Sequence, residues 1–471
     1  MRKALIAVTL ALGTQWASAQ SNDASTVERG KYIATAADCA GCHGENLAGG
    51  AAIASPLGPI YASNITPDTR TGIGDWSEEQ LRDALRKGRA PGKGWLYPAM
   101  PYTSYTGIND ADVSALYAYL QSVPAVNHEV RATDLSFPFI RPAMIAWNVL
   151  YLKEGHAAGE KPAQGESAER GRYLVEALGH CSACHTPRGV LMAELPEQHL
   201  GGAFVGGWQA PNLTNDKSGL GSWSDQELKQ FLQKGHNPVA VAGGDMGLAV
   251  SRSLSHLGDS EIADIIAYLR QVPPVITQAL PAAPSRAAHV DPDTVEGPIT
   301  GWRNLANNAT TDGAVLYQSA CASCHGVDGT GTAGPDLGRL RDLRSAHPNN
   351  LVQVIAGGIN LEIEGRHILM PGFRDQMNNE QIAALARYVR STFGQVPGSG
   401  PDEQEVASIL SDKTPVSLLI SYAPALAWGA IVVLVLLVGW VCGLSSWCQL
   451  PLIRSIKWLS QNSQKRRYQV S

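Results

Sequence analysis

The sequence has little net charge and no recognisable nucleotide-binding motif, and each absence excludes a class of function. The 471 residues carry a formal charge of −5, and only 17% of them are charged. This balance gives no electrostatic reason to expect nucleic acid as a partner. We also find no glycine-rich motif placed between a predicted strand and a predicted helix. We therefore expect no nucleic-acid partner and no substrate-oxidising site in this chain, which is predicted not to be an enzyme on its own.

Cysteine is scarce as well, and six of the eight cysteines lie in three copies of the pentapeptide Cys-x-x-Cys-His. The copies begin at Cys39, Cys181 and Cys321, at nearly equal intervals. Two thiols at this spacing can each form a thioether with a haem vinyl group, and the following histidine can bind the iron. A single copy could be a redox or zinc motif. Three copies predict three covalently bound haem c groups.

The predicted haem-binding residues follow directly from these motifs. The attachment cysteines are Cys39, Cys42, Cys181, Cys184, Cys321 and Cys324, and the iron-binding histidines are His43, His185 and His325. Two neighbours are further candidates. The backbone carbonyl at Pro335 could accept a hydrogen bond from the iron-binding imidazole, and Arg188 could pair with a haem propionate. For both, ordinary loop structure is the alternative.

Methionines are also few, and three of them recur at comparable places. Met100, Met246 and Met370 each lie between their motif and the last predicted helix of the repeat. A thioether is a common sixth ligand of haem iron and raises the reduction potential. A lone methionine is more often core filler, but the parallel placement predicts iron ligation by all three. Met246 lies in a looser segment, 243–247, and His367 is a weak rival to Met370.

The repeats define the predicted fold. We expect an all-α protein with three tandem cytochrome c-like domains and one C-terminal transmembrane helix. The domains are predicted at residues 20–155, 166–280 and 301–397. The first two are near duplicates, because segments such as 64–68 and 212–216 correspond. The third is more divergent.

Capping patterns predict where helices begin and end. Ser77 and Gln80 form a capping-box pattern, which predicts a helix that starts at Glu78 and ends at Gly88. Each repeat is predicted to close with an amphipathic helix, at 110–123, 259–272 and 379–393. The apolar segment 135–152 is expected to pack against the neighbouring haem domain. Docking of a partner subunit is the alternative.

Both ends of the chain carry targeting signals. Residues 1–19 have the basic start, short apolar run and Ala-x-Ala site of a signal peptide. The alternative, a membrane anchor, needs a longer apolar run. Residues 421–446 are predicted to form a transmembrane helix, because 425–444 carry no charge; a buried core helix is the alternative. The basic tail, 447–471, predicts a single pass through the cytoplasmic (inner) membrane, with the tail in the cytoplasm and the haem domains in the periplasm.

Together, these features resemble the tri-haem cytochrome c subunits of bacterial membrane-bound dehydrogenases. The resemblance rests on the third Cys-x-x-Cys-His motif and on segments 63–68, 96–102, 116–120 and 179–189. It implies a catalytic partner subunit that carries pyrroloquinoline quinone, flavin or a molybdenum cofactor and oxidises an alcohol, aldehyde, gluconate, sorbitol or fructose. The haems would pass the electrons to ubiquinone. Two alternatives are a free-standing membrane-anchored respiratory cytochrome c that donates to a terminal oxidase, and a haem peroxidase or gas sensor.

Overall fold

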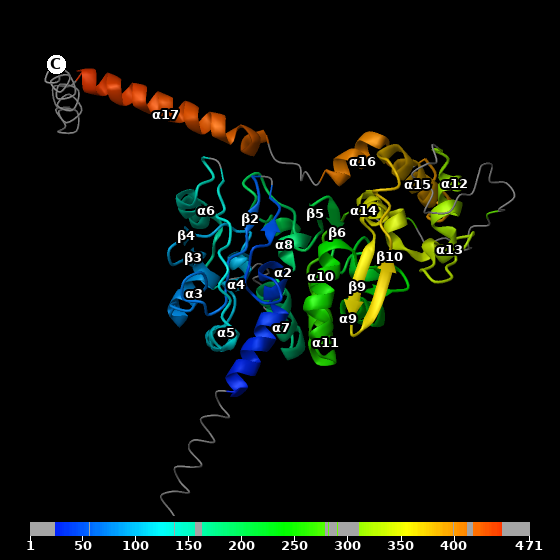
Figure 1. The fold of residues 1–471 in the computed structure, drawn as a ribbon, viewed down its shortest axis with the longest axis horizontal. Helices are drawn as coiled ribbons and strands as arrows, with labels where there is room; N and C mark the ends of the chain where they lie inside the picture. Colours follow the sequence, from blue (N-terminus) through cyan, green and yellow to red (C-terminus); the bar gives the residue numbers. More distant parts are fainter. Residues whose placement is uncertain are drawn as a thin grey trace, which may run out of the picture. The chain divides into compact units, whose positions relative to one another are not determined.

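A computed structural model describes most of the chain. The described residues are 24–55, 57–135, 137–155, 163–277, 281, 290, 310–398, 400–411 and 418–444. The chain divides into two compact units. The larger, Met1–Leu135 with Ile140–Pro415, holds all three motifs, and the smaller, Ser136–Phe139 with Val416–Ser471, holds the C-terminal helix (Figure 1). The predicted signal peptide and basic tail lie outside the described residues.

The first repeat is built from helices joined by long loops. A helix over residues 24–36 leads into the first motif. The other elements, in order, are α2 (Cys39–His43), β1 (Ala52–Ile53), β2 (Ile60–Tyr61), α3 (Glu78–Lys87), β3 (Arg89–Ala90), β4 (Gly94–Trp95), α4 (Tyr102–Tyr105), α5 (Asp110–Ser122), η1 (Arg141–Ala143) and α6 (Met144–Tyr151). Ser77 and Gln80 form the predicted capping box, and Gly88 ends α3 in a left-handed conformation. Both predicted ends of this helix are confirmed.

The second repeat follows the same order, with an added π-helical segment, three short 3₁₀ segments and a longer helix before the closing one. Its elements are α7 (Glu166–Arg172), η2 (Tyr173–Leu178, π-helical), α8 (Ser182–His185), η3 (Pro196–Gln198), β5 (Ala203–Val205), β6 (Trp208–Ala210), η4 (Leu220–Ser222), α9 (Asp225–Lys234), β7 (His236–Asn237), β8 (Ala240–Val241), α10 (Gly244–Arg252), η5 (Leu254–His256) and α11 (Asp259–Leu269). The Ser224–Glu227 pair repeats the capping box at the start of α9.

The third repeat contains the longest strands among the described residues. Its elements are α12 (Gly313–Ala320), α13 (Ala322–His325), η8 (Leu337–Arg339), η9 (Arg341–Arg344), α14 (Asn349–Gly357), β9 (Ile359–Ile363), β10 (Arg366–Met370), α15 (Asn379–Thr392) and α16 (Glu403–Leu410). The hairpin β9–β10 pairs in antiparallel register, with Ile363 opposite Arg366. The helix-rich fold was predicted. The all-α prediction was wrong in detail, because five two-stranded ribbons occur in the described parts of the chain.

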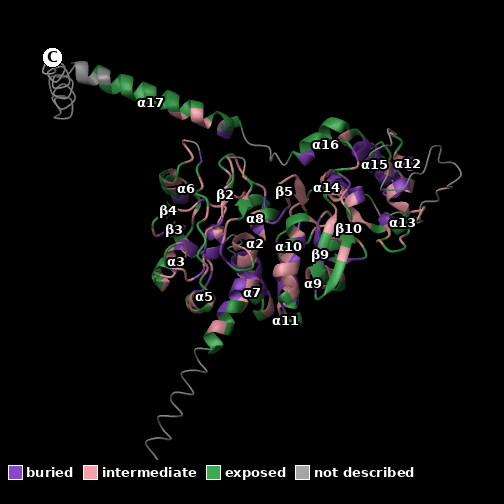
Figure 2. Ribbon diagram, viewed as in Figure 1, coloured by how far each residue is buried: buried purple, intermediate pink, exposed green. Residues whose placement is uncertain are grey.

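Hydrophobic packing joins the repeats of the larger unit. One cluster of buried residues contains side chains from the first two repeats, such as Leu116 and Ile262. A second cluster lies in the third repeat. The third repeat also packs against the second, where the Asn350 amide donates to the Gln209 carbonyl oxygen at 3.1 Å and accepts its N–H at 2.9 Å. Figure 2 shows many buried residues on helix α15 of the third repeat.

The first and last helices of each repeat cross at a glycine. A Cβ atom on this glycine would lie within 2.5 Å of a carbonyl oxygen of the closing helix in the pairs Gly30–Ala115, Gly171–Asp264 and Gly313–Ala384. Only glycine lets two helix backbones approach this closely. Ion pairs flank two of the crossings: Arg29 with Asp112 at 2.8 Å, and Arg170 with Asp264 at 2.7 Å.

Replacing Gly171 by alanine is expected to lower the free energy of unfolding by about 1–3 kcal/mol. The new Cβ would lie 1.8 Å from the Asp264 carbonyl oxygen, so α7 and α11 would have to move apart. Urea denaturation of the detergent-solubilised protein measures the loss. Gly357→Ala is the matched control, because a Cβ there meets nothing within 4 Å. Equal losses in the two variants would show that the helix crossing is not the cause.

The apolar segment around α6 has two different faces. The Trp147 ring packs edge-on against Tyr102, with ring centroids 6.4 Å apart. Its Nε1–H donates to the Leu191 carbonyl oxygen of the second repeat at 2.9 Å. On the other face, Val149 is 80% exposed and Leu150 is 65% exposed. One face therefore packs as predicted, and the other is open to solvent.

Candidate haem-binding sites

The three motif histidines make the same hydrogen bond. Their Nδ1 atoms lie 2.6, 2.7 and 3.2 Å from a backbone carbonyl oxygen in the pairs His43–Ser63, His185–Pro211 and His325–Pro335, respectively. A carbonyl oxygen can only accept, so Nδ1 carries the proton and Nε2 keeps a free lone pair. This is the tautomer that an iron ligand needs. The predicted contact of the Pro335 carbonyl with the motif imidazole is confirmed.

Burial keeps these imidazoles neutral. It lowers the pKa of His43, His185 and His325, and the hydrogen bond to the carbonyl only partly opposes that effect. A neutral ring can donate its Nε2 lone pair to a metal, whereas a protonated ring cannot. The protonation state and the tautomer therefore both suit iron binding.

An asparagine holds the carbonyl-bearing loop in the first two repeats. Asn64 follows Ser63, and its Oδ1 accepts the backbone N–H of Thr66 at 2.9 Å while its Nδ2 donates to the Val126 carbonyl oxygen at 2.8 Å. Asn212 makes the corresponding bonds at 2.8 and 2.7 Å in the second repeat. Both side chains are buried. The correspondence of segments 64–68 and 212–216 was visible in the sequence, but their role was not. In the structure, the two asparagines hold the loop whose carbonyl oxygen bonds the imidazole.

The motif cysteines are free thiols in apolar surroundings. None of the six forms a disulfide. Burial raises the pKa of Cys39, Cys181 and Cys321 to about 12, so these thiols are neutral. Cys39 and Cys181 border the hydrophobic cluster of the first two repeats, and Cys321 borders that of the third. Two thiols, one available Nε2 and apolar walls fit the attachment of haem c.

Met100 and Met370 lie near the apolar surroundings of their own motifs. Met100 packs against the same hydrophobic cluster as Cys39. Met370 ends strand β10 and packs against the same cluster as Cys321. Both side chains are partly buried. The rival His367 is 62% exposed and lies 3.8 Å from Glu362. Ligation of the iron by Met100 and Met370 stays a prediction.

Met246 has different surroundings from those predicted. It lies in the first turn of α10, whereas the sequence suggested a looser segment. Its side chain packs against a cluster that includes Val250 of α10 and Leu361 of β9, in the third repeat. Cys181 borders another cluster. The structure therefore does not bring Met246 and Cys181 into one cluster, and ligation by Met246 also stays a prediction.

Arg188 is held within its own loop. Its guanidinium donates to the carbonyl oxygens of Ala183 at 2.6 Å and Met192 at 3.2 Å. It also lies 3.8 Å from the Glu194 carboxylate. These contacts match the alternative given for this residue, ordinary loop structure.

The first two motifs lie close together, which sequence reasoning did not show. Helix α10 of the second repeat contacts α2, and Arg252 donates to the Gly41 carbonyl oxygen at 3.4 Å. The ring of Tyr105 packs edge-on against His180, the residue before Cys181, with centroids 5.6 Å apart. Burial lowers the pKa of His180. The two candidate haem sites therefore share a wall of buried side chains.

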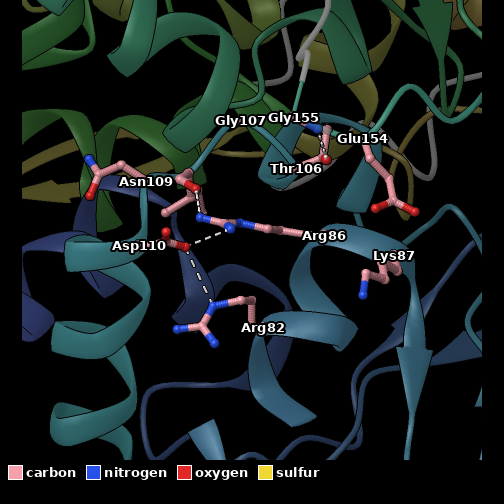
Figure 3. A pocket seen from close by; sticks show the side chains of 10 residues that line it. Arg82, Arg86, Lys87, Thr106, Gly107, Asn109, Asp110, Glu154 and Gly155 are labelled. Carbon is pink, nitrogen blue, oxygen red and sulfur yellow. Dashed lines mark hydrogen bonds and ion pairs between the residues drawn. The ribbon is translucent and has the colours of Figure 1, made fainter. Parts of the chain in front are cut away.

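An open pocket elsewhere in the first repeat contains none of the predicted haem-binding residues (Figure 3). Arg86 and Arg82 converge there on Asp110, with N–O distances of 2.8 and 3.5 Å. Arg86 also donates to the Ile108 carbonyl oxygen. These bonds tie α3 to the start of α5, so the pocket lies at a structural joint between the two helices.

Family models match the three regions of the chain that contain the motifs. A family model described as cytochrome c matches residues 27–124 and 168–273. A model described as cytochrome C oxidase, cbb3-type, subunit III matches residues 308–389.

Three curated relatives match most of the chain. The fructose dehydrogenase cytochrome subunit of Gluconobacter japonicus is 41% identical over 78% of this chain and 79% of its own length. The gluconate 2-dehydrogenase cytochrome c subunit of Pantoea cypripedii is 36% identical over 88% and 96%. The cytochrome c subunit of the quinone alcohol dehydrogenase of Gluconacetobacter polyoxogenes is 34% identical over 87% and 90%. The chain therefore belongs to the family of cytochrome c subunits of fructose, gluconate and alcohol dehydrogenase complexes.

Proposed function

We propose that the chain is a membrane-anchored electron-transfer subunit with three haem c groups. It relays electrons from the catalytic subunit of a periplasmic dehydrogenase to ubiquinone. The observation that carries this proposal is the common geometry of the three motif imidazoles, each with Nδ1 bonded to a carbonyl oxygen and Nε2 free. The relatives support the dehydrogenase partner, since they are named as cytochrome subunits of such enzymes.

Each repeat would hold its haem in the same way. The two motif cysteines attach the macrocycle, and the histidine binds one face of the iron. Met100, Met246 and Met370 are proposed to bind the opposite face in their repeats. A bound haem supplies a one-electron couple, and the apolar clusters around the motifs exclude water from it. Residues 20–155, 166–280 and 301–397 are the proposed haem domains.

The anchor is proposed to be α17 (Leu418–Leu444), which begins a few residues before the predicted position. Its segment Ile420–Val438 is long and apolar enough to cross a bilayer. Figure 2 shows α17 exposed along most of its length, as a lipid-facing helix would be and a core helix would not. The predicted signal peptide and basic tail support an inner-membrane protein with periplasmic haem domains.

The catalytic partner is proposed to carry pyrroloquinoline quinone, flavin or a molybdenum cofactor. Purification from membranes tests this partnership. A large subunit that co-purifies with sugar, alcohol or aldehyde oxidation coupled to ubiquinone reduction supports the proposal. Co-purification with a terminal oxidase alone would instead indicate the free-standing respiratory cytochrome.

The pyridine haemochrome assay is expected to give three haems per chain. The matched variant replaces Cys321 and Cys324 by alanine, which removes both attachment thiols of the third motif and should lower the content to two. A value of one or two in the unmodified protein would contradict the assignment of a haem to every motif.

A further inference from the structure

A buried carboxylate in the second repeat has no part in haem attachment. Glu176 lies in the π-helical segment η2 and is fully buried. Its Oε1 accepts two hydrogen bonds, from the Tyr268 hydroxyl at 2.6 Å and from Nε2 of His199 at 2.8 Å. Its Oε2 is buried with no hydrogen-bond partner among the described residues. A buried carboxylate with an unpartnered oxygen is costly, which points to a role beyond packing.

The helix that carries Glu176 is adapted to hold it. Gly171 precedes Cys181 by ten residues, whereas Gly30 precedes Cys39 by nine in the first repeat. The second repeat accommodates the extra residue with wide helical turns: the N–H of Cys181 donates to the Val175 carbonyl oxygen at 3.1 Å. Insertions of this kind into α-helices are frequent at functional sites. The first repeat has a regular helix over 24–36, with no buried acid in it.

Charged and titratable groups surround the cluster on several sides. Arg172 lies on the same helix, where it is paired with Glu169 at 2.5 Å, and its positive charge acts on Tyr268. The negative charge of Glu194 acts on His199. Burial lowers the pKa of His199, but the bond to Glu176 and its charge outweigh that effect, so the net pKa is raised. The bond to Glu176 therefore favours the protonated form of the imidazole.

The cluster is close enough to the second motif to affect its haem. After burial, the charge of Glu176 is the largest cause of the raised pKa of Cys181. The same Coulomb interaction would act on an iron-bound macrocycle attached at that sulfur. The side chain of His199 is 15% exposed, so a proton can reach it from solvent. The side chain of Glu176 is fully buried.

We propose that Glu176, His199 and Tyr268 form a redox-linked proton site for the haem of the second repeat. When one electron reduces the ferric haem to ferrous, one proton from solvent adds to the His199–Glu176 pair. The proton returns to solvent when the haem gives up its electron, and no other bond in the protein breaks. The added electron makes the surroundings more negative, so it favours the protonated pair. This inference rests on the proposed attachment of a haem to Cys181 and Cys184.

Potentiometric titration of the detergent-solubilised full chain between about pH 5 and 8 tests the proposal. We expect the reduction of the second-repeat haem to become less favourable as pH rises. The change is at most tenfold in the redox equilibrium constant per pH unit, or about 59 mV for one electron. Glu176→Gln and His199→Gln should each abolish this dependence. Any pH dependence that Asp38, beside Cys39, confers on the first-repeat haem should persist in both variants and serves as an internal reference.

Tyr268→Phe keeps the ring and removes only the hydroxyl. Oε1 of Glu176 then bonds His199 alone, so the pH window of the shift should move upward. Tyr119→Phe at the corresponding place in the first repeat is the matched control and should change nothing. The proposal is overturned if all steps in the unmodified protein are independent of pH, or if Glu176→Gln and His199→Gln leave the dependence of every step unchanged. If the proton site is overturned but the protein contains three haems, the proposed function still stands. Fewer than three haems would contradict the proposed function itself.

Discussion

Replacing Met100 by leucine is expected to lower the reduction potential of one haem by on the order of 0.2 V, a fraction of the range that axial ligands span. Leucine keeps the volume and removes the sulfur. A thioether favours ferrous iron, so its loss stabilises the ferric form. The vacated coordination position would also admit carbon monoxide. Met100 packs against the cluster that Cys39 borders, so the expected change belongs to the first-repeat haem.

Redox titration and carbon monoxide difference spectra measure both effects. Met377→Leu is the matched control, because Met377 is 3% exposed in the core of the third repeat and is not a predicted ligand. It should change stability by less than about 1.5 kcal/mol and leave every potential in place. Unchanged spectra in Met100→Leu would remove this residue as a ligand. Met246→Leu tests in the same way whether Met246, which packs against β9, binds the iron of the second haem.

Ending the chain after Ser411 is expected to move the protein from the membrane to the soluble fraction. Apolar residues in a spanning helix contribute about 0.3–0.6 kcal/mol each, so twenty of them contribute on the order of 10 kcal/mol. The larger unit has its own hydrophobic clusters, which contain no residue of α17. The truncated protein should therefore keep its haems and lose ubiquinone reduction in membranes.

Membrane fractionation and haem content measure this outcome. The control deletes only residues 447–471, which retains α17 and should leave the protein in the membrane. If the longer truncation stayed in membranes after a high-salt wash, α17 would not be the anchor. The exposed apolar face of α6, with Val149 and Leu150, would then be the next surface to test.

Much of the helical framework could be predicted because its signals are local. The helix predicted from Glu78 to Gly88 forms with the expected capping box and glycine end. The closing helices α5, α11 and α15 all begin at the predicted residue. In each case a capping side chain or an apolar stripe within one or two turns decides the structure. The predicted membership of the dehydrogenase cytochrome family is also confirmed.

Features that depend on distant contacts could not be predicted. The partners of Glu176 lie 23 and 92 residues away in the chain, so the sequence around it shows only an acid in an apolar helix. Met246 was expected in a looser segment because glycines surround it, yet it lies in helix α10 and packs against the cluster that contains Leu361. The hairpin β9–β10 also packs against α10, which a repeat-by-repeat reading of the sequence cannot show.

Helix α10 connects all three repeats of the larger unit. It contacts α2 beside the first motif, belongs to the second repeat, and packs against β9 of the third. Electron tunnelling slows steeply as the gap between redox centres widens. The separations of the three motifs are thus set by packing between the repeats, to which α10 contributes together with the cluster shared by the first two repeats and the Asn350–Gln209 hydrogen bonds. Insertions into the segments between the predicted domains, 156–165 and 281–300, are therefore expected to leave the tunnelling distances unchanged.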